Sequence, residues 1–237
     1  MTAPTERAAE IAAGLDAVRR RIGAACRDAG RDPDEVTLVV VTKFFPATDV
    51  RLLADLGVRH LGENRHQEAE AKAAECADLD LTWHYIGGLQ SNKAAAVAAY
   101  ADVVESVDRA KLLAGLSRGA HQRSHDLDCL VQVSLDPPDA GAGRAGVPVD
   151  QLSDLAADLA SRGMLRLRGL MAVAPLDEDP VAAFARLADV RRDFLVDHPD
   201  ASWLSAGMSA DLEAAIGCGA THVRIGRAVL GERPRIK

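Results

Sequence analysis

The sequence predicts an α/β protein with one domain over residues 1–237, a single (β/α)8 TIM barrel that carries an extra N-terminal helix. Short runs of β-branched and apolar residues alternate with helical patterns eight times, and this alternation is typical of a parallel sheet. The length of 237 residues is close to the roughly 250 that such a barrel needs. No GxGxxG or GxxxxGK[ST] motif follows a strand, so neither a dinucleotide fold nor an NTPase is indicated.

The first helix is expected over residues 5–29, where Ile11, Leu15, Val18 and Ile22 form one apolar stripe. Eight runs rich in Val, Ile and Leu predict the strands, at residues 36–41, 58–62, 82–86, 103–107, 127–135, 167–172, 203–205 and 221–225. Helical patterns separate them, at residues 48–56, 65–77, 91–100, 108–119 and 150–161, in a segment ending near 196, and at 210–217 and 227–230.

Polar and turn-forming residues are expected to bound several of these elements. Thr48 and Asp108 precede helical patterns and are expected as N-caps. Gly87 and Gly88 follow the third strand. Residues 136–148 are rich in Pro and Gly and form the longest irregular stretch, which is interpreted either as a mobile segment at the barrel mouth or as a plain surface loop.

Composition excludes several classes of protein. Hydrophobic residues make up 48% but aromatic residues only 3%, so Ala, Leu and Val are expected to fill the core. A net charge of -7 argues against a nucleic-acid binder. With no long apolar run and no secretory signal, we expect a cytoplasmic protein. The four cysteines (Cys26, Cys76, Cys129 and Cys218) form no CxxC pair, so they are expected to be reduced and mostly buried, and no zinc site is indicated.

Lys43 lies at the end of the first apolar strand, where α/β folds place their chemistry. Burial lowers the pKa of a lysine, and a neutral amine can form a Schiff base. The alternative is a lysine whose ammonium group reaches solvent from the strand end.

In a closed barrel, strands two, seven and eight lie close to strand one, and polar residues are found at the carboxyl ends of these strands as well. They are Glu63 and Asn64 after strand two, Ser205 after strand seven, and Arg224, Gly226 and Arg227 at the end of strand eight. The loops after strands seven and eight commonly bind a phosphate in this fold, because helix starts present free N–H groups. A buried lysine opposite such a loop suggests pyridoxal 5'-phosphate (PLP).

Each of these residues also has a purely structural interpretation. Asn64 could cap the helix that begins at residue 65, and Ser205 and Ser209 could be helix caps. Arg224 could pair with an acidic neighbour, although the functional interpretation is favoured. Glu63 could be the ion-pair partner of Lys43 or of Arg224. A histidine within a strand, His84, is more often a hydrogen-bonded core residue.

Seven segments, in this order along the chain, resemble the pyridoxal phosphate homeostasis proteins, the YggS/PROSC-type family. They are residues 41–43 (VTK), 61–64 (LGEN), 83–87 (WHYIG), 89–93 (LQSNK), 167–171 (LRGLM), 204–216 (LSAGMSADLEAAI) and 223–226 (VRIG). The resemblance implies a barrel like the N-terminal domain of alanine racemases, with PLP held as a Schiff base on Lys43. It also implies Asn64 near the ring hydroxyl, Arg224 facing the pyridine nitrogen, and Ser205 with the Gly226 and Arg227 amides on the phosphate.

The chain departs from the family pattern at three positions. Arg227 replaces a common threonine, so a hydroxyl contact to phosphate is lost, and its guanidinium could replace that contact or point to solvent. Ala206 replaces a common methionine, which changes packing. Arg144 stands where a lysine is often found, and an arginine cannot form a Schiff base. Lys93 is another candidate for a second contact, although a solvated helix lysine is favoured.

The resemblance implies vitamin B6 homeostasis inside the cell rather than efficient catalysis. A charged arginine at the ring nitrogen keeps that nitrogen unprotonated, which weakens the electron sink. Tyr85 is expected to point outward and Tyr100 to lie on the amino-terminal side, which leaves no obvious base. The alternative is a weak PLP-dependent amino-acid racemase that uses a base such as His84. Further expectations are a monomer, PLP as ligand, and PLP-dependent apoenzymes as transient partners.

Overall fold

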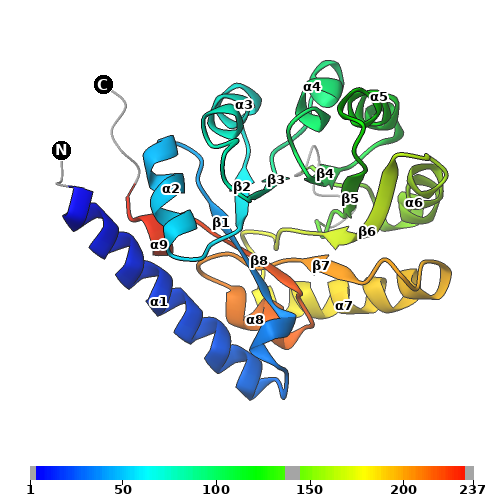
Figure 1. Ribbon diagram of the computed structural model, residues 1–237. Helices are drawn as coiled ribbons and strands as arrows, with labels where there is room; N and C mark the ends of the chain where they lie inside the picture. Colours follow the sequence, from blue (N-terminus) through cyan, green and yellow to red (C-terminus); the bar gives the residue numbers. More distant parts are fainter. Residues whose placement is uncertain (1–3, 137–144, 233–237) are drawn as a thin grey trace.

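The computed structural model describes residues 4–136 and 145–232, which form a closed eight-stranded parallel barrel (Figure 1). Its strands are β1 (Thr37–Val41), β2 (His60–Glu63), β3 (Thr82–Tyr85), β4 (Val103–Val107), β5 (Leu127–Gln132), β6 (Leu165–Met171), β7 (Trp203–Ser205) and β8 (His222–Ile225). Strand β8 closes the barrel on β1, with Val39 opposite Arg224 and Val40 opposite Ile225. The predicted TIM barrel with an extra N-terminal helix is therefore confirmed.

Helices surround the barrel in chain order. They are α1 (Pro4–Asp28), α2 (Ala47–Asp55), α3 (His66–Glu75), α4 (Ala94–Ala98), α5 (Leu113–Arg123), α6 (Leu152–Ala160), α7 (Pro180–Asp197), α8 (Leu212–Gly217) and α9 (Arg227–Leu230). Short 3-10 turns precede β1, α4, α5 and α6, at Pro33–Glu35, Ser91–Lys93, Ala110–Leu112 and Val149–Gln151.

Two expected helix caps are wrong. Helix α2 begins one residue before Thr48, and its N-cap is Pro46. After β4 the chain first forms a 3-10 turn capped by Arg109, so Asp108 stands outside the helix and instead pairs with the Arg109 guanidinium at 2.5 Å. In both cases the backbone turn that leaves the strand, rather than the capping preference of a side chain, decides where the helix starts.

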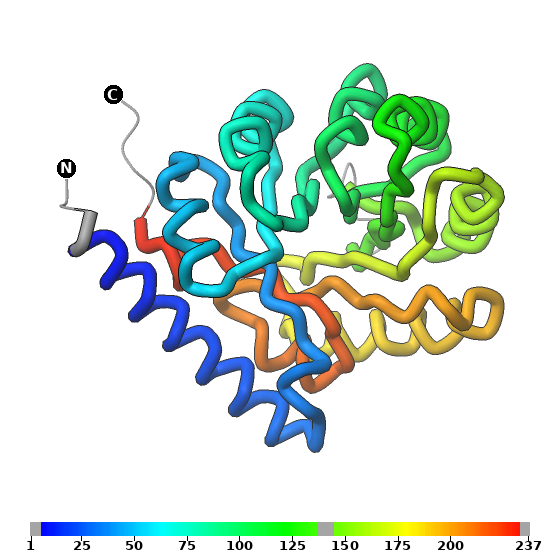
Figure 2. Tube along the Cα trace, in the orientation of Figure 1, coloured from blue at the N-terminus to red at the C-terminus, as the bar shows by residue number. Residues whose placement is uncertain are grey.

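Helix α1 lies on the outside of the barrel, along α2, α8 and α9 (Figure 2). Its expected stripe is buried, with Ile11, Leu15 and Val18 at most 1% exposed and Ile22 slightly more. Arginines at its two ends reach the barrel shell. Near the start, Arg7 Nη2 bonds Asp49 at 2.7 Å and the Leu230 carbonyl at 3.0 Å. Near the end, Arg21 Nε bonds Glu213 at 2.7 Å.

Side chains alternate between the helical shell and the barrel interior. Val40, Leu61, Trp83, Val223 and Ile225 belong to the apolar cluster under α1 and α2, as the period of two along a strand requires. The interior positions between them are unusually polar. They include four buried residues: His84, Glu105, Ser205 and Arg224. The usual TIM barrel fills this space with layers of branched aliphatic side chains. The polar side chains found here instead make the interior a candidate for a functional site.

Among the described helices, none is both long and apolar enough to cross a membrane. Within residues 4–136 and 145–232, no cluster of His, Cys, Asp and Glu could hold a metal ion. All four cysteines are free thiols, and all but Cys218 are buried. Arg144 and most of the 136–148 stretch lie outside the described residues.

Candidate functional site

The carboxyl ends of β1, β2 and β8 bring three of the predicted residues to one rim of the barrel. Val41 pairs with Gly62, and the Thr42 amide donates to the Gly62 carbonyl at 3.0 Å. Lys43 and Asn64 follow directly on these two neighbouring strands. Gly226 follows β8 and lies so close to β1 that a Cβ on it would be 3.2 Å from the Val41 carbonyl oxygen. Any side chain at residue 226 would therefore crowd the rim.

Lys43 lies in a tight turn just beyond β1, and it is half-buried, whereas the last three residues of β1 are buried. The next residue, Phe44, has φ +71, a left-handed conformation that costs a non-glycine residue about 1–2 kcal/mol. The Arg65 guanidinium stacks over the Phe44 ring at 4.5 Å. The turn that presents Lys43 is therefore strained and is held by its surroundings.

Helix α3 supplies a charged group directly behind this turn. The ammonium group of Lys72 donates to the Thr42 carbonyl at 2.7 Å and to Glu63 Oε1, and it forms an ion pair with Glu68 Oε1 at 2.9 Å. Glu68 Oε1 also accepts the Phe44 amide at 2.5 Å. We call these five residues, Thr42, Phe44, Glu63, Glu68 and Lys72, the α3 network. The expectation that Glu63 pairs with Lys43 or Arg224 is wrong, because strand alternation turns Glu63 outward to Lys72.

Glu63 is almost fully buried in this network. Its Oε1 also accepts the Thr42 hydroxyl at 2.7 Å, while Oε2 has no hydrogen-bond partner among the described residues. Burial raises the pKa of Glu63 and outweighs the opposing effect of the Lys72 charge and of the two hydrogen bonds. No sequence pattern indicates a role for Lys72, because a lysine in the middle of a helix is typical of a solvated charge.

Asn64 carries an unsatisfied polar atom at the rim. Its Oδ1 is buried and has no hydrogen-bond partner among the described residues. The N-cap of α3 is Arg65, so the alternative that Asn64 caps this helix is wrong. Gly87 fixes its position, because a Cβ at residue 87 would lie 2.7 Å from the Asn64 Cα. Buried polar atoms without partners are rare and call for an explanation such as a ligand.

Arg224 and Ser205 meet inside the barrel. Arg224 Nη1 donates to Ser205 Oγ at 2.6 Å, and Nη2 donates to the Ala172 carbonyl at 2.9 Å. The Ser205 hydroxyl donates to Glu105 Oε2 at 2.5 Å, and that oxygen lies 3.8 Å from Arg224 Nη1. The acidic neighbour considered for Arg224 is therefore Glu105, which sequence reasoning missed. Neither Ser205 nor Ser209 is a helix cap, since the N-cap of α8 is Asp211.

The polar contacts continue from Glu105 across the interior. His84 Nδ1 lies 2.8 Å from Glu105 Oε1, and His84 Nε2 lies 3.0 Å from His60 Nδ1. A carboxylate can only accept, so the hydrogen of the first bond belongs to His84. We call His60, His84, Glu105, Ser205 and Arg224 the interior network. The interpretation of His84 as a hydrogen-bonded core histidine is confirmed.

Burial and charge shift the pKa values of this interior in opposite directions. Burial alone would raise the pKa of Glu105, but the hydrogen bond and charge of His84, the charge of Arg224 and the Ser205 hydroxyl hold it at about 2. Burial lowers the pKa of Arg224. Burial also lowers the pKa of His60 to about 4 and that of the nearby His222 to about 3.

The Arg227 side chain is exposed and lines a groove of about 410 Å³ between α1 and α9, which also involves Arg7, Glu10 and Gly14. This groove lies outside the barrel and does not include Lys43, Asn64 or Arg224. The backbone of residue 227 nevertheless begins α9 at the end of β8. The site is therefore defined by the strand ends rather than by this groove.

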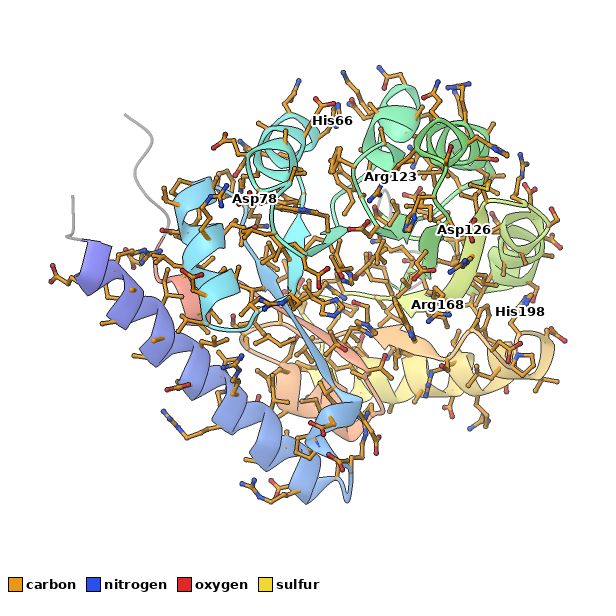
Figure 3. The ribbon with its side chains drawn as sticks, viewed as in Figure 1. His66, Asp78, Arg123, Asp126, Arg168 and His198 are labelled. Atoms are coloured by element: carbon orange, nitrogen blue, oxygen red, sulfur yellow. The ribbon has the colours of Figure 1, made fainter. Side chains whose placement is uncertain are left out.

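Both tyrosines pack in the helical shell. Tyr85 belongs to an apolar cluster with Ala94 and Val97 of α4, which confirms that it points outward. Tyr100 stacks on His66 with ring centres 5.9 Å apart. His66 begins α3 on the outside of the barrel (Figure 3), so the Tyr100 ring packs in the helical shell as well.

Comparison with known proteins places the chain in a family. The family model of the alanine racemase N-terminal domain matches residues 14–234. The pyridoxal phosphate homeostasis protein of Mycobacterium bovis is 40% identical over 98% of this chain and 96% of its own length. The protein of the same description from Escherichia coli is 37% identical over 94% of this chain and 97% of its own length.

Solved structures agree with this assignment. PipY of Synechococcus elongatus, solved with PLP bound, superposes with a TM-score of 0.80 at 35% identity, covering 93% of this chain and 100% of PipY. Alanine racemase of Clostridium difficile has a TM-score of 0.64 at 14% identity, over 91% of this chain and 57% of its own, and shares the fold alone. The chain belongs to the pyridoxal phosphate homeostasis protein family and carries the alanine racemase N-terminal domain of that family.

Proposed function

We propose that this protein binds PLP as a Schiff base on Lys43 and serves intracellular vitamin B6 homeostasis, without efficient catalysis. The observation that carries the proposal is the buried Asn64 Oδ1, which lacks a partner among the described residues and lies on the strand end next to Lys43. A ligand with a polar ring substituent would satisfy this atom. The names of the relatives and the PLP bound to PipY support the same ligand.

The residues at the rim fit the parts of PLP. Lys43 offers an amine for the aldehyde, and Asn64 offers an amide for the ring hydroxyl. Arg224, a permanently charged donor, would face the pyridine nitrogen. The backbone amides of Gly226 and Arg227 would bind the phosphate, because a glycine lets the backbone approach an anion closely. When bound, PLP supplies an electrophilic carbon and an electron-accepting ring.

The Ser205 hydroxyl is already hydrogen-bonded to Glu105 and Arg224. We therefore assign Ser205 first to the orientation of Arg224 and only second to the phosphate. The exposed Arg227 guanidinium lines the groove beside α1, so its contribution to the phosphate is assigned to the backbone amide.

Efficient catalysis is not expected from these residues. An arginine at the ring nitrogen disfavours protonation there, which weakens carbanion stabilisation. Tyr85 and Tyr100 pack in the helical shell, away from the interior. The alternative function is a weak amino-acid racemase with His84 as its base. Both ring nitrogens of His84 are occupied, by Glu105 and His60, so this alternative is disfavoured.

The proposed cellular role follows from reversible binding of PLP. A protein that holds PLP through a reversible bond limits free aldehyde and can pass the cofactor to PLP-dependent apoenzymes. We propose that it does so in the cytoplasm, as a single domain over residues 1–237 and as a monomer.

The test is the absorbance of the protein titrated with PLP, followed by borohydride reduction and peptide mapping. The chain has five lysines, Lys43, Lys72, Lys93, Lys111 and Lys237, so the labelled peptide identifies the amine. We expect an imine band in the wild type, with the label on Lys43, and loss of the band in Lys43→Ala. Lys111→Ala is the matched control, because Lys111 is exposed on a turn before α5.

A second measurement separates binding from catalysis. Amino acids are incubated with the PLP-loaded protein in deuterated water and examined by mass spectrometry. No deuterium at the α-carbon is expected from a carrier. Deuterium incorporation that disappears in Lys43→Ala would support the racemase instead. A label on Lys93 in the wild type would mean that the wrong lysine has been assigned.

A further inference from the structure

We propose that α3 positions Lys43 for Schiff-base formation by holding both peptide groups that flank it, through Glu68 and Lys72. This inference rests on the proposed function, because it concerns how the same lysine is presented. Glu68 and Lys72 are positioning residues, since they act on Lys43 and not on the cofactor.

The contacts on the two sides of Lys43 carry the inference. The carbonyl of Thr42 belongs to the peptide bond before Lys43, and it accepts the Lys72 ammonium at 2.7 Å. The amide of Phe44 belongs to the peptide bond after Lys43, and it donates to Glu68 Oε1 at 2.5 Å. The two side chains are joined to each other at 2.9 Å. One helix therefore fixes the backbone on both sides of the reactive residue.

The geometry of α3 explains how two side chains can do this together. Glu68 and Lys72 are four residues apart, so they lie on the same face of the helix, one turn apart. That face is turned to the end of β1, and the Lys72 side chain is only 6% exposed. A solvent-exposed ion pair between residues i and i+4 of a helix contributes little to stability. A buried ion pair that also makes hydrogen bonds to the backbone is held in one geometry.

Strain in the turn shows why a support is needed. Phe44 adopts φ +71, a conformation that side chains rarely take. Such a conformation persists only when the surroundings hold it. If the bond from Glu68 were lost, the turn would relax and the direction of the Lys43 side chain would change.

Lys72 itself is excluded as the reactive amine by its contacts. Its ammonium group donates hydrogen bonds to Thr42 and Glu63 and forms an ion pair with Glu68. To attack an aldehyde, the Lys72 amine would first have to break these contacts. The label after borohydride reduction should therefore not fall on Lys72, although Lys72 is the more buried of the two lysines.

The test compares Glu68→Ala with Glu68→Gln. The glutamine keeps a carbonyl oxygen that can accept the Phe44 amide, while the alanine removes it. Glu70→Ala is the matched control, since Glu70 lies on the same helix but points to solvent. Two quantities are measured: the rate of imine formation after mixing with PLP, and the dissociation constant of pyridoxine 5'-phosphate. The latter carries an alcohol in place of the aldehyde and cannot form the imine.

We expect Glu68→Ala to slow imine formation roughly tenfold to a hundredfold, with the dissociation constant of pyridoxine 5'-phosphate unchanged. Glu68→Gln and Glu70→Ala should form the imine at the wild-type rate. In the protein without PLP, hydrogen exchange of the Phe44 amide should become faster in Glu68→Ala and stay slow in Glu68→Gln. This last readout requires no cofactor.

Two results would overturn the inference. Equal rates of imine formation in all variants would show that the α3 contacts do not position Lys43. A parallel loss of imine rate and of affinity for pyridoxine 5'-phosphate would show that Glu68 only maintains the fold. Both differ from failure of the proposed function, in which the wild type itself would give no label on Lys43. Lys72→Met, checked for folding by circular dichroism, provides a second variant with the same expected pattern.

Discussion

The α3 network and the interior network are both buried and charged, yet they hold different parts of the site. The α3 network lies between barrel and helix and fixes two backbone groups around Lys43. The interior network lies inside the barrel and fixes one side chain, that of Arg224. The first relies on a lysine, Lys72, with two hydrogen bonds and an ion pair. The second relies on a carboxylate, Glu105, whose two oxygens are both bonded.

The difference shows how one barrel can position two functional groups in two ways. A flexible side chain such as arginine needs its own hydrogen-bond partners to stay in one rotamer, and the barrel interior supplies them. For Lys43, the described contacts from α3 hold the peptide groups on either side of the residue. Buried ion pairs often add little stability because of the cost of removing charge from water. In this protein, the buried ion pairs are better explained by the groups that they hold in place, Arg224 and the turn at Lys43.

The largest effect is expected when Glu105, the centre of the interior network, is removed. Glu105→Ala leaves the charge of Arg224 and the hydrogen-bonded His84 without their partner, which should cost about 3–5 kcal/mol in the free energy of unfolding. Denaturant titration of the protein without cofactor measures it. Glu105→Gln keeps the size and two polar atoms and should lose less. If alanine and glutamine were equally destabilising, the charge rather than the bonds would be the source of the stability.

The α3 network should respond to the loss of its lysine in a pH-dependent way. Lys72→Met leaves Glu63 and Glu68 unpaired, and we expect a loss of about 3 kcal/mol at pH 8. Burial already raises the pKa of Glu63, so its ionisation costs stability above that pKa, and the removal of Lys72 increases this cost. The loss should therefore shrink at pH 5, where Glu63 more readily takes up a proton.

The matched variant for this prediction is Lys72→Met combined with Glu63→Gln, which removes the buried carboxylate. Its stability should depend less on pH than that of Lys72→Met alone. Denaturant titrations at both pH values compare them. A pH-independent loss in both variants would point to packing rather than charge.

Acid should weaken the interior before the α3 network. The pKa of His222 is about 3 in the folded protein and about 6.5 when the chain is unfolded. Its contribution to stability is therefore present above pH 6.5 and is lost progressively as the pH falls toward 3, with on the order of 2 kcal/mol lost by pH 5. Glu105, with a pKa of about 2, adds a further loss as the pH falls below its unfolded pKa of about 4.3.

Substitution of His222 isolates this effect. His222→Asn should flatten the fall in unfolding free energy between pH 6.5 and 4, measured by denaturant titration across that range. His125→Asn is the control, because His125 is exposed and should leave the slope unchanged. Equal slopes in both variants would assign the acid sensitivity to other groups.

The smallest effect concerns the uncharged part of the rim. Gly87→Ala places a Cβ 2.7 Å from the Asn64 Cα and should cost about 1–2 kcal/mol in stability, with a weaker affinity for PLP because Asn64 is displaced. Gly88→Ala is the matched control, since a Cβ there meets no atom within 4 Å. Thermal unfolding and PLP titration compare the two. An affinity for PLP that is unchanged in a destabilised Gly87→Ala would remove Asn64 from the site.

Several elements have the bounds that the sequence predicts. Strands β4 and β7 and helix α9 begin and end where the pattern placed them, and the buried stripe of α1 is the expected one. Capping preferences gave the wrong N-cap at Thr48 and Asp108, because the backbone turn after the strand sets where the helix begins. The spacing of Cys and Gly residues served mostly to exclude zinc proteins, dinucleotide folds and NTPases.

The sequence by itself determined the barrel and the strand ends that carry Lys43, Asn64 and Arg224. The hydrophobic period of each element and the order of the elements along the chain are both present in the sequence. Only the tertiary structure decided which charges meet. Glu105 and Lys72 are distant in sequence from the groups that they hold, Arg224 and the Lys43 turn, and nothing near them in the sequence marks them as partners. The closure of the barrel turns Glu105 inward to Arg224, and the packing of α3 against β1 brings Lys72 to Thr42. Contacts of this kind depend on the direction of each side chain in the folded barrel, which strand pairing and helix packing set.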